Sequence, residues 1–368
     1  MGAAIPITGR FAYAGQGFLE GFTDAIDYIN ARGGVAGRRF EIVIEDTGYD
    51  LQKGVAAFNR ILSRPDAGQI LFMFGDSTGL SKAVAQQVNE VHKVPYSAAT
   101  MANELTDPQQ HPYIFIFGPS YDGQFHVLLD YIRAQHRGPA SPKIALVYSD
   151  TEFGRDPIPY VKRRAGELGF TIVAEEVIPA TAVDVTANVL KIRRAGADYV
   201  LTQGYTVEIP PLLMKTGRQF GYTPRVFGGF WSADVSFIQR GGEAADGFLV
   251  VNWVPYWTDD NQGIRAIKAF LQERGKAYEQ RSTYYVWAWL IALTVSEAMN
   301  RAAAAGDLSR DGVRRALERM ADYNALGLVA STDFSQHQLA QARIYRANAS
   351  AGRFEPVSDW ISAVVSRR

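Results

Sequence analysis

The sequence alternates between short apolar runs and longer amphipathic segments, and this rhythm limits the folds that the chain can adopt. In the first hundred residues the apolar runs are AAIPI, FEIVIED and ILFMFG, and helices are expected over about residues 17–31, 52–62 and 80–91. Strands that alternate with helices in this way are typical of a parallel sheet with helices on both faces. The sequence therefore predicts an α/β fold with a doubly wound parallel sheet.

A second series of strands begins after a break in the rhythm. The break is FGPSYDG at residues 117–123, where a strand gives way to Gly, Pro, Ser and Asp before a new helix. The strand candidates that follow are KIALVYSD, FTIVAEEVI, DYVLTQG, RVFGGF and GFLVVNW. Residues 261–320 are helical without strands of their own, so we expect them to pack on the first sheet. The chain is therefore predicted to form two lobes, one of residues 1–120 with 251–330 and one of residues 121–250 with 331–368.

Length, charge and cysteine content exclude several classes of protein. At 368 residues the chain suits two domains, given about 150 residues per domain. Lys and Arg together number 38, as do Asp and Glu, so no overall charge attracts nucleic acid. The longest apolar run, residues 284–293, is half of the ~20 residues that cross a bilayer, which indicates a buried helix. The absence of cysteine excludes disulfides and thiolate catalysis, and we expect no cofactor and no metal.

Glycine motifs of nucleotide-binding proteins are missing or incomplete. The stretch GQGFLEG at residues 15–21 is close to G-x-G-x-x-G, but its last glycine comes one place late, and we interpret it as the turn that enters a helix. The phosphate-binding pattern G-x-x-x-x-G-K-[ST] does not occur. The sequence thus gives no support to nucleotide hydrolysis.

One motif, GDSTG at residues 75–79, raises the question of catalysis. It fits the G-x-S-x-G pattern that holds a nucleophilic serine between a strand and a helix. A hydrolase of that kind needs more strands before the serine than the two found here, and an oxyanion loop that the sequence lacks. The histidines, which could act as a base or as metal ligands, are scattered at positions 92, 111, 126, 136 and 337. We therefore interpret Ser77 as a hydrogen-bond donor and keep an esterase only as an alternative.

Small and hydroxyl-bearing residues follow two of the strand candidates. Ser77 and Thr78 come directly after ILFMFG, and the stretch SAAT at residues 97–100 follows VPY. The carboxyl ends of parallel strands meet at one edge of the sheet, where open α/β folds bind ligands. Free backbone N–H groups at a helix start, with hydroxyl groups beside them, suit a carboxylate. Helix capping accounts for the same hydroxyls, so both interpretations stay open.

Longer stretches of the sequence resemble a known family. IPITGRFAYAGQGFLEGF, INARGGVAGR, EIVIEDTGYDLQKGVAAFNRIL, VPYSAATMANELT, VYSDTEFGRD and GGFWSADVS are similar to the branched-chain amino-acid-binding proteins, the type I periplasmic solute-binding components of ABC transporters. The resemblance covers nearly the whole chain. It implies a type I periplasmic-binding-protein fold with two lobes and a ligand trapped between them without chemical change. Three crossings would join the lobes, near residues 118–122, 250–254 and 329–334.

The resemblance also implies roles for individual residues. Ser77 and Thr100 match a serine and a threonine that hold the ligand carboxylate, and Ala98 matches a position that offers its backbone. The other expected ligand-binding residues are aromatic: Tyr13, Phe153, Tyr205, Phe230, Trp231 and Tyr285. Such rings suggest a planar ligand, because offset stacking adds ~0.5–1.5 kcal/mol per ring pair beyond burial. Core packing is the alternative for several of them.

The sequence departs from the family at VFGGFW. Amino-acid binders usually carry an acidic residue here that pairs with the ligand ammonium, whereas this chain has Phe230 followed by Trp231. Burying an ammonium without a countercharge would cost several kcal/mol. Asp76, Asp122 or Glu208 could in principle supply that charge. We expect instead a carboxylate ligand without an α-amino group, and an aromatic acid in particular.

These features predict an extracytoplasmic solute-binding protein rather than an enzyme. The resemblance implies a periplasmic location, with a signal peptide removed ahead of residue 1, and the permease subunits of an ABC importer as partners. We expect a monomer that binds a small carboxylate and no nucleic acid. The alternatives are a ligand sensor on the same fold, a branched-chain amino-acid binder and a Ser77 esterase.

Overall fold

The computed structural model describes residues 1–277 and 280–365, and the chain forms two compact units. Unit 1 consists of Met1–Gly118 and Val254–Leu339, and unit 2 begins at Pro119, runs to Trp253 and resumes at Ala340. The chain therefore passes between the units after Gly118, Trp253 and Leu339. Residues 278–279 of the first expected lobe and residues 366–368 of the second lie outside the described residues.

The third passage follows Leu339 and so lies later in the chain than residues 329–334, the position expected from the family resemblance. Backbone hydrogen bonds explain why the chain stays with unit 1 for longer. The Ile116 N–H donates to the His337 carbonyl at 2.8 Å, and the Leu339 N–H donates to the Gly118 carbonyl at 3.3 Å. The segments that lead to the first and third passages thus run side by side within unit 1.

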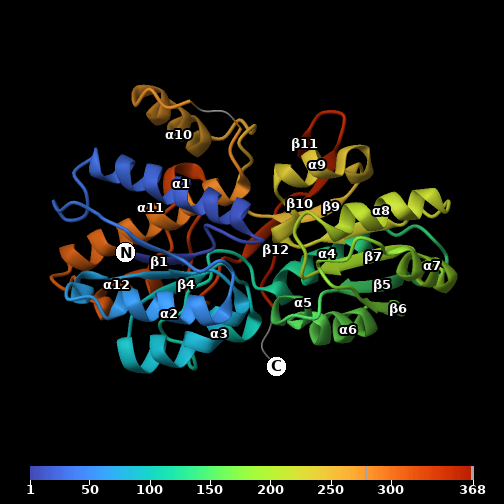
Figure 1. Cartoon of the computed structure of the whole chain (residues 1–368), viewed down its shortest axis with the longest axis horizontal. Helices are drawn as coiled ribbons and strands as arrows, with labels where there is room; N and C mark the ends of the chain where they lie inside the picture. Colours follow the sequence, from blue (N-terminus) through green and yellow to red (C-terminus); the bar gives the residue numbers. More distant parts are fainter. Residues whose placement is uncertain (278–279, 366–368) are drawn as a thin grey trace. The chain divides into compact units, whose positions relative to one another are not determined.

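Unit 1 is built on a four-stranded parallel sheet with the strand order β2-β1-β3-β4. Figure 1 labels β1 and β4 of this sheet. Its strands are β1 (Gly2–Ile5), β2 (Val43–Asp46), β3 (Met73–Gly75) and β4 (Tyr96–Ala98). Its helices are α1 (Ala12–Asn30), α2 (Leu51–Leu62), α3 (Thr78–Gln86), α10 (Gln262–Glu273), α11 (Thr283–Ala304) and α12 (Arg310–Glu318). The helices expected over residues 261–320 therefore belong to the unit that holds the first sheet.

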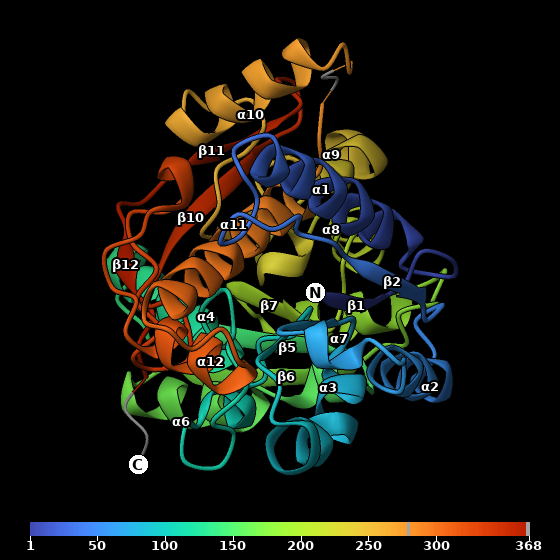
Figure 2. The same cartoon turned by 90° about the vertical axis from the view of Figure 1, so that its left-hand side faces the viewer.

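Helices α1 and α11 lie against each other although the sequence separates them widely (Figure 2). Glycines on α1 allow this approach. A Cβ at Gly17 would lie 2.5 Å from the Ser282 hydroxyl oxygen, and one at Gly21 would lie 2.5 Å from the Tyr285 carbonyl oxygen. The apolar run at residues 284–293 is buried within α11, as expected. None of the helices in the described part of the chain has the length and apolar character of a membrane span.

Unit 2 holds a larger mixed sheet with the order β11-β10-β9-β8-β7-β5-β6, and β12 pairs with β10. Strands β5 to β9 are parallel to one another, whereas β10 is antiparallel to β9 and β11. The strands are β5 (Lys143–Tyr148), β6 (Thr171–Val177), β7 (Tyr199–Gln203), β8 (Arg225–Gly228), β9 (Leu249–Asn252), β10 (Gln341–Asn348), β11 (Arg353–Pro356) and β12 (Ile361–Ser362). The helices are α4 (Tyr121–Gln135), α5 (Glu152–Arg155), α6 (Ile158–Glu167), α7 (Thr186–Ala195), α8 (Ile209–Gln219) and α9 (Val235–Gly241).

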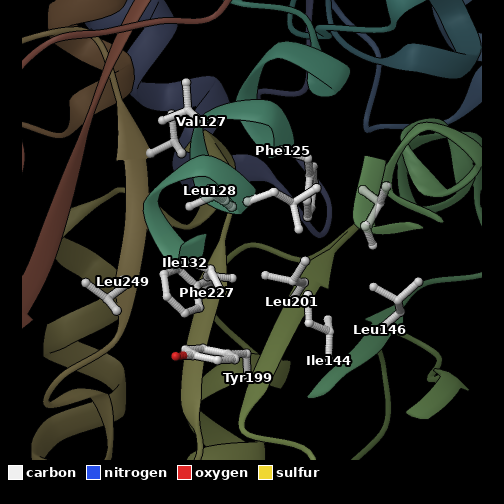
Figure 3. Close-up of a cluster of buried hydrophobic side chains, with 14 of the residues drawn as sticks. Phe125, Val127, Leu128, Ile132, Ile144, Leu146, Tyr199, Leu201, Phe227 and Leu249 are labelled. Atoms are coloured by element: carbon white, nitrogen blue, oxygen red, sulfur yellow. The ribbon is translucent and has the colours of Figure 1, made fainter. Parts of the chain in front are cut away.

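The core of unit 2 lies between helix α4 and the parallel strands (Figure 3). Phe125, Leu128 and Ile132 recur at helical spacing on α4 and are almost fully buried. They face strand residues such as Leu201 and Phe227, which are buried as well. Burying side chains of this size contributes about 1.5–3 kcal/mol each. This core fixes the start of α4, and with it the residues that follow the first passage.

The predicted alternation of strands and helices is confirmed, but some helices begin or end at other residues than expected. Helix α1 begins at Ala12, so GQGFLEG lies inside the helix and is not the turn that enters it. The reason is packing, because a Cβ at Gly15 would lie 2.0 Å from the Pro6 carbonyl oxygen. The helix expected over residues 80–91 is divided into α3 and a π-helical segment, Gln87–His92.

Candidate functional site

Ser77 lies at the start of helix α3, directly beyond the end of strand β3. Its hydroxyl oxygen accepts a hydrogen bond from the Leu80 N–H at 3.1 Å, so Ser77 caps the helix. Its carbonyl oxygen accepts from the Ser81 N–H at 3.0 Å and from the Ser81 hydroxyl at 2.6 Å. A hydroxyl that accepts from the backbone still has its own proton to donate.

Strand β4 brings Ala98 and Thr100 to the same edge of the sheet. Ala98 is paired with Gly75 of β3, and the Ala99 N–H donates to the Gly75 carbonyl at 2.7 Å. The Thr100 hydroxyl is fully buried and lies 2.6 Å from the Thr78 hydroxyl. It also accepts from the Ala102 N–H at 3.2 Å. Three of the expected carboxylate-binding residues are therefore neighbours in unit 1.

A buried carboxyl group stands beside these residues. Asp76 is 5% exposed, and the Thr47 hydroxyl donates to it. Burial raises the pKa of Asp76 to about 6, against smaller opposing effects of hydrogen bonds from Thr47 and Ser77. Burial also acts to raise the pKa of Asp46, but hydrogen bonds from Thr8 and Gly48 outweigh it, and that pKa lies below its usual value.

The two tyrosines expected from unit 1 are held by contacts within the unit. The Tyr285 hydroxyl donates to Asp24 at 2.8 Å, and Lys276 binds the same carboxylate. Burial raises the pKa of Tyr285 above its usual range. The Tyr13 ring packs edge-on against Tyr284 with 5.9 Å between centroids. Contact of either tyrosine with a ligand stays a prediction.

Aromatic rings gather at the carboxyl ends of strands β5 and β8 in unit 2. Phe230 stacks on Trp253 with 4.0 Å between ring centroids and lies 5.8 Å from Trp231. Phe153 lies 6.2 Å from Trp231 and 5.5 Å from Tyr121. We call these five residues the aromatic cluster. It unites three of the expected residues with Tyr121 and Trp253, which the sequence patterns did not indicate.

Buried amide side chains hold the aromatic cluster in place. The Gln124 side-chain carbonyl accepts from the Phe230 N–H at 3.0 Å, and its amide donates to the Pro119 carbonyl at 3.0 Å. The Gln203 amide donates to the Phe153 carbonyl at 2.8 Å. Buried polar groups are retained where hydrogen bonds satisfy them, and here they fix the backbone that carries the rings. Tyr121 and Gln124 lie three residues apart in the first turn of α4, directly after the first passage between the units. Their position and helical spacing are a sequence signal that could have identified both residues.

The remaining expected residues of unit 2 also have partners within that unit. The Tyr205 hydroxyl donates to the Ile178 carbonyl at 2.7 Å, and burial raises its pKa above the usual range. Glu208 accepts from the Thr206 hydroxyl at 2.8 Å and the Val207 N–H at 3.2 Å. Burial raises the pKa of Asp122 to about 7, and the charge of Asp156 adds to the effect. Burial therefore opposes the negative charge of Asp122.

The histidines do not complete a catalytic arrangement around Ser77. Four of them hydrogen-bond elsewhere: His111 with Asn89, His126 with Tyr160, His136 with Tyr199 and His337 with the Ile114 carbonyl. Over the described ranges, which omit residues 278–279 and 366–368, no group of acidic or histidine side chains could hold a metal ion. In the described part of the chain, the surroundings of Ser77 thus lack the arrangement of a hydrolytic centre.

The comparisons with known proteins agree with this geometry. The family of periplasmic binding proteins matches residues 1–353, and the chain belongs to that family. Its members and structural neighbours are solute-binding proteins of ABC transporters and not enzymes, so the esterase alternative is not supported.

Relatives and solved structures match most of the chain. A Leu/Ile/Val-binding protein homolog of Brucella abortus is 24% identical over 318 residues, which cover 82% of this chain and 76% of that protein. The structure of a branched-chain amino acid ABC transporter protein from Thermus thermophilus with bound valine is 27% identical, with a TM-score of 0.87 and coverage of 98% and 95%. A fatty acid ABC transporter substrate-binding protein from Thermomonospora curvata shares the fold at 21% identity, with a TM-score of 0.84 and coverage of 98% and 91%.

Proposed function

We propose that this protein is an extracytoplasmic solute-binding protein that captures a small aromatic carboxylate and delivers it to an ABC importer. Ser77, Ala98 and Thr100 of unit 1 would bind the carboxylate, and the aromatic cluster of unit 2 would contact the ligand body. Tyr13, Tyr205 and Tyr285 complete the proposed set of ligand-binding residues. The protein would act in the periplasm as a monomer, with permease subunits as its partners.

The observation that carries the proposal is the environment of position 230. Phe230 is fully buried, stacks on Trp253 and donates its backbone N–H to the side-chain oxygen of an uncharged glutamine. An apolar ring in an apolar setting supplies no negative charge to pair with a ligand ammonium, whose burial without a countercharge costs several kcal/mol. The same setting suits a planar apolar body.

Branched-chain amino acids are the second candidate, and one observation favours them. The relatives include a Leu/Ile/Val-binding protein homolog and a protein solved with bound valine. An amino acid would require an acidic partner other than residue 230, and Asp76 is a buried carboxyl beside the proposed carboxylate-binding residues. The fold itself does not require an amino acid as ligand. The Thermomonospora curvata protein of the same fold is a fatty acid transporter's binding protein, and a fatty acid has a carboxylate and no ammonium.

Matched pairs of ligands separate the two candidates. We would measure the melting temperature of the protein with phenylalanine against 3-phenylpropanoate, and with leucine against 4-methylpentanoate, since each pair differs only in the ammonium. A ligand at a hundred times its dissociation constant stabilises the folded state by ~2.7 kcal/mol. We expect the 3-phenylpropanoate arm to raise the melting temperature and the phenylalanine arm to leave it unchanged.

Two further ligands test the other parts of the proposal. 3-Phenylpropanamide lacks the negative charge and should not bind, and 3-cyclohexylpropanoate lacks the planar ring and should bind more weakly. Stabilisation by leucine with none by 3-phenylpropanoate would overturn the aromatic-acid proposal and favour the amino-acid binder.

A further inference from the structure

Asp76 is a buried ionisable group that neither the fold nor the proposed carboxylate contacts explain. It lies between Gly75, the last residue of β3, and Ser77, the cap of α3. A side chain that served only to end the strand would not need a charge. Its position instead places a carboxyl group directly beside the residues proposed to hold a ligand carboxylate.

The surroundings of Asp76 contain hydroxyl groups and acids. The Thr47 hydroxyl donates to its Oδ2 atom, and Ser77 supplies a further hydrogen bond that favours the ionised form. Two further titratable groups interact with it: Asp46 at the end of β2, which β1 separates from β3, and Tyr96 on the neighbouring strand β4. Asp46 is ionised, and burial keeps the Tyr96 phenol neutral by raising its pKa above the usual range. No cation is among these partners in the described part of the chain.

An uncompensated carboxyl of this kind responds to the charge of a ligand. A carboxylate bound at Ser77 and Thr100 repels an ionised Asp76 and so favours its neutral form. An amino acid brings the same carboxylate, but its ammonium would pair with Asp76 directly, and this attraction favours the ionised form. Because the pKa of Asp76 in the ligand-free protein is about 6, both its ionised and its neutral form are available near neutral pH.

We propose that Asp76 is a specificity-determining residue that couples ligand binding to a proton and selects between simple carboxylates and amino acids. The inference rests on the proposed carboxylate-binding role of Ser77 and Thr100. Binding of a simple carboxylate then takes up a proton at Asp76, so its affinity falls as the pH rises. Binding of an amino acid favours the ionised Asp76, so its affinity rises with the pH.

Calorimetric titration over about pH 5.5 to 8 tests this coupling, with 3-phenylpropanoate, phenylalanine, 4-methylpentanoate and leucine as probes. We expect the dissociation constant of a bound simple carboxylate to increase above about pH 6 by up to about tenfold per pH unit, the limit for one linked proton. Repeating the titration in two buffers of different ionisation enthalpy counts the protons that are taken up.

Asp76→Asn should remove both the pH dependence and the proton uptake, because asparagine still accepts from Thr47 but does not titrate. Asp76→Ser is a second non-titrating variant, should the first fold poorly, and melting curves verify that each is folded. Asp66→Asn is the matched control, since Asp66 is an exposed acid that pairs with Arg64 in the segment that enters β3. It should keep the wild-type profile.

The outcomes separate this inference from the proposed function. If only the amino acids bind, and their affinity rises with pH through Asp76, the aromatic-acid proposal fails and the role of Asp76 stands. If a simple carboxylate binds with a pH profile that Asp76→Asn leaves unchanged, the role of Asp76 is refuted and the proposed function stands. If none of the four probes binds at any pH, both are refuted.

Discussion

Ser77 combines two tasks in one hydroxyl group. Its oxygen accepts from the Leu80 N–H and caps α3, while its single proton, which hydrogen-bonds to Asp76 here, would turn to a ligand carboxylate on binding. The capping and binding interpretations of the sequence are therefore compatible. Substitution should reveal the two contributions separately, because one affects the stability of the protein and the other affects its affinity.

Ser77→Ala should weaken binding of 3-phenylpropanoate by about 1.5–3 kcal/mol, the contribution of a hydrogen bond to a charged group. It should also lower stability by about 1 kcal/mol through loss of the cap. Ser309→Ala is the matched control, because Ser309 caps α12 of the same unit by accepting from the Gly312 N–H at 3.1 Å. Titration calorimetry measures the loss of affinity, and melting curves measure the loss of stability. Equal affinity for 3-phenylpropanoate in the two variants would remove Ser77 from the site.

Phe230 can be tested against a second stacked phenylalanine. We expect Phe230→Leu to weaken binding of 3-phenylpropanoate about two- to tenfold, the loss of one ring contact, and Phe230→Glu to weaken it further by adding a negative charge. Phe237 stacks on Phe248 with 4.2 Å between centroids and is equally buried, so Phe237→Leu should cost stability alone. Titration calorimetry provides the test, and equal losses of affinity in the two leucine variants would contradict a role for Phe230.

Asp122 gives a prediction about stability and pH. Its pKa in the folded protein, about 7, is higher than the ordinary aspartate value of 3.8, so the folded state binds this proton more tightly than the unfolded chain. Stability conferred by that proton is present at low pH and is lost as the pH rises from about 4 to about 7. Asp122→Asn should therefore gain up to about 4 kcal/mol at pH 8 relative to the wild type, with little gain near pH 4.

Melting temperatures measured across this range, with Asp66→Asn as an exposed control, test the effect. The gap between Asp122→Asn and the wild type should open as the pH rises and stay closed for the control. A constant gap would mean that Asp122 does not titrate in this window.

At the scale of elements, helices α1 and α11 pack closely against each other. Gly21→Ala would place a Cβ 2.5 Å from a backbone carbonyl and 2.7 Å from the Ala288 Cβ. Backbone atoms cannot move aside as a flexible side chain can, so we expect a loss of about 1–3 kcal/mol. A Cβ added at Gly166 of α6 would meet no neighbouring side chain or distant backbone within 4 Å, so Gly166→Ala should be neutral or slightly stabilising. Chemical denaturation of both variants measures the difference.

The order of elements could be predicted from the sequence because periodicity is a local property. The first and last residues of individual elements could not be predicted where tertiary packing determines them. GQGFLEG has the composition of a turn, yet its glycines serve the contacts of α1 with Pro6 and with the start of α11. These partners are remote in the sequence, and only the tertiary structure brings them together.

The candidate site could be predicted only in part, because only some of its residues are brought together by local sequence order. Ser77 and Thr100 follow strands β3 and β4, and Ala98 is the last residue of β4; these strands are adjacent in both sequence and sheet, so local reasoning places the three residues together. The aromatic cluster depends on the order β8-β7-β5, which differs from the order along the chain. Tyr121 and Trp253 lie next to passages between the units, where no strand pattern marks them.

At the scale of the whole molecule, we propose that the two units move together when a ligand binds. The chain passes between them after Gly118, Trp253 and Leu339, so only a few residues need to change their backbone angles. Small-angle scattering should give a smaller radius of gyration in saturating 3-phenylpropanoate than in 3-phenylpropanamide. Identical curves, for a ligand that calorimetry shows to be bound, would indicate a rigid protein.

The three passages also determine when each unit can be completed during synthesis. Helix α1 emerges from the ribosome early, but α11, which covers it, follows only after most of unit 2 has been made. Unit 2 in turn waits for β10, which lies beyond the last residue of unit 1. Neither unit can complete its hydrophobic core before about the final tenth of the chain has been made. Chains of this size commonly fold through intermediates. We therefore expect the nascent polypeptide to expose apolar surface until most of the chain has been made.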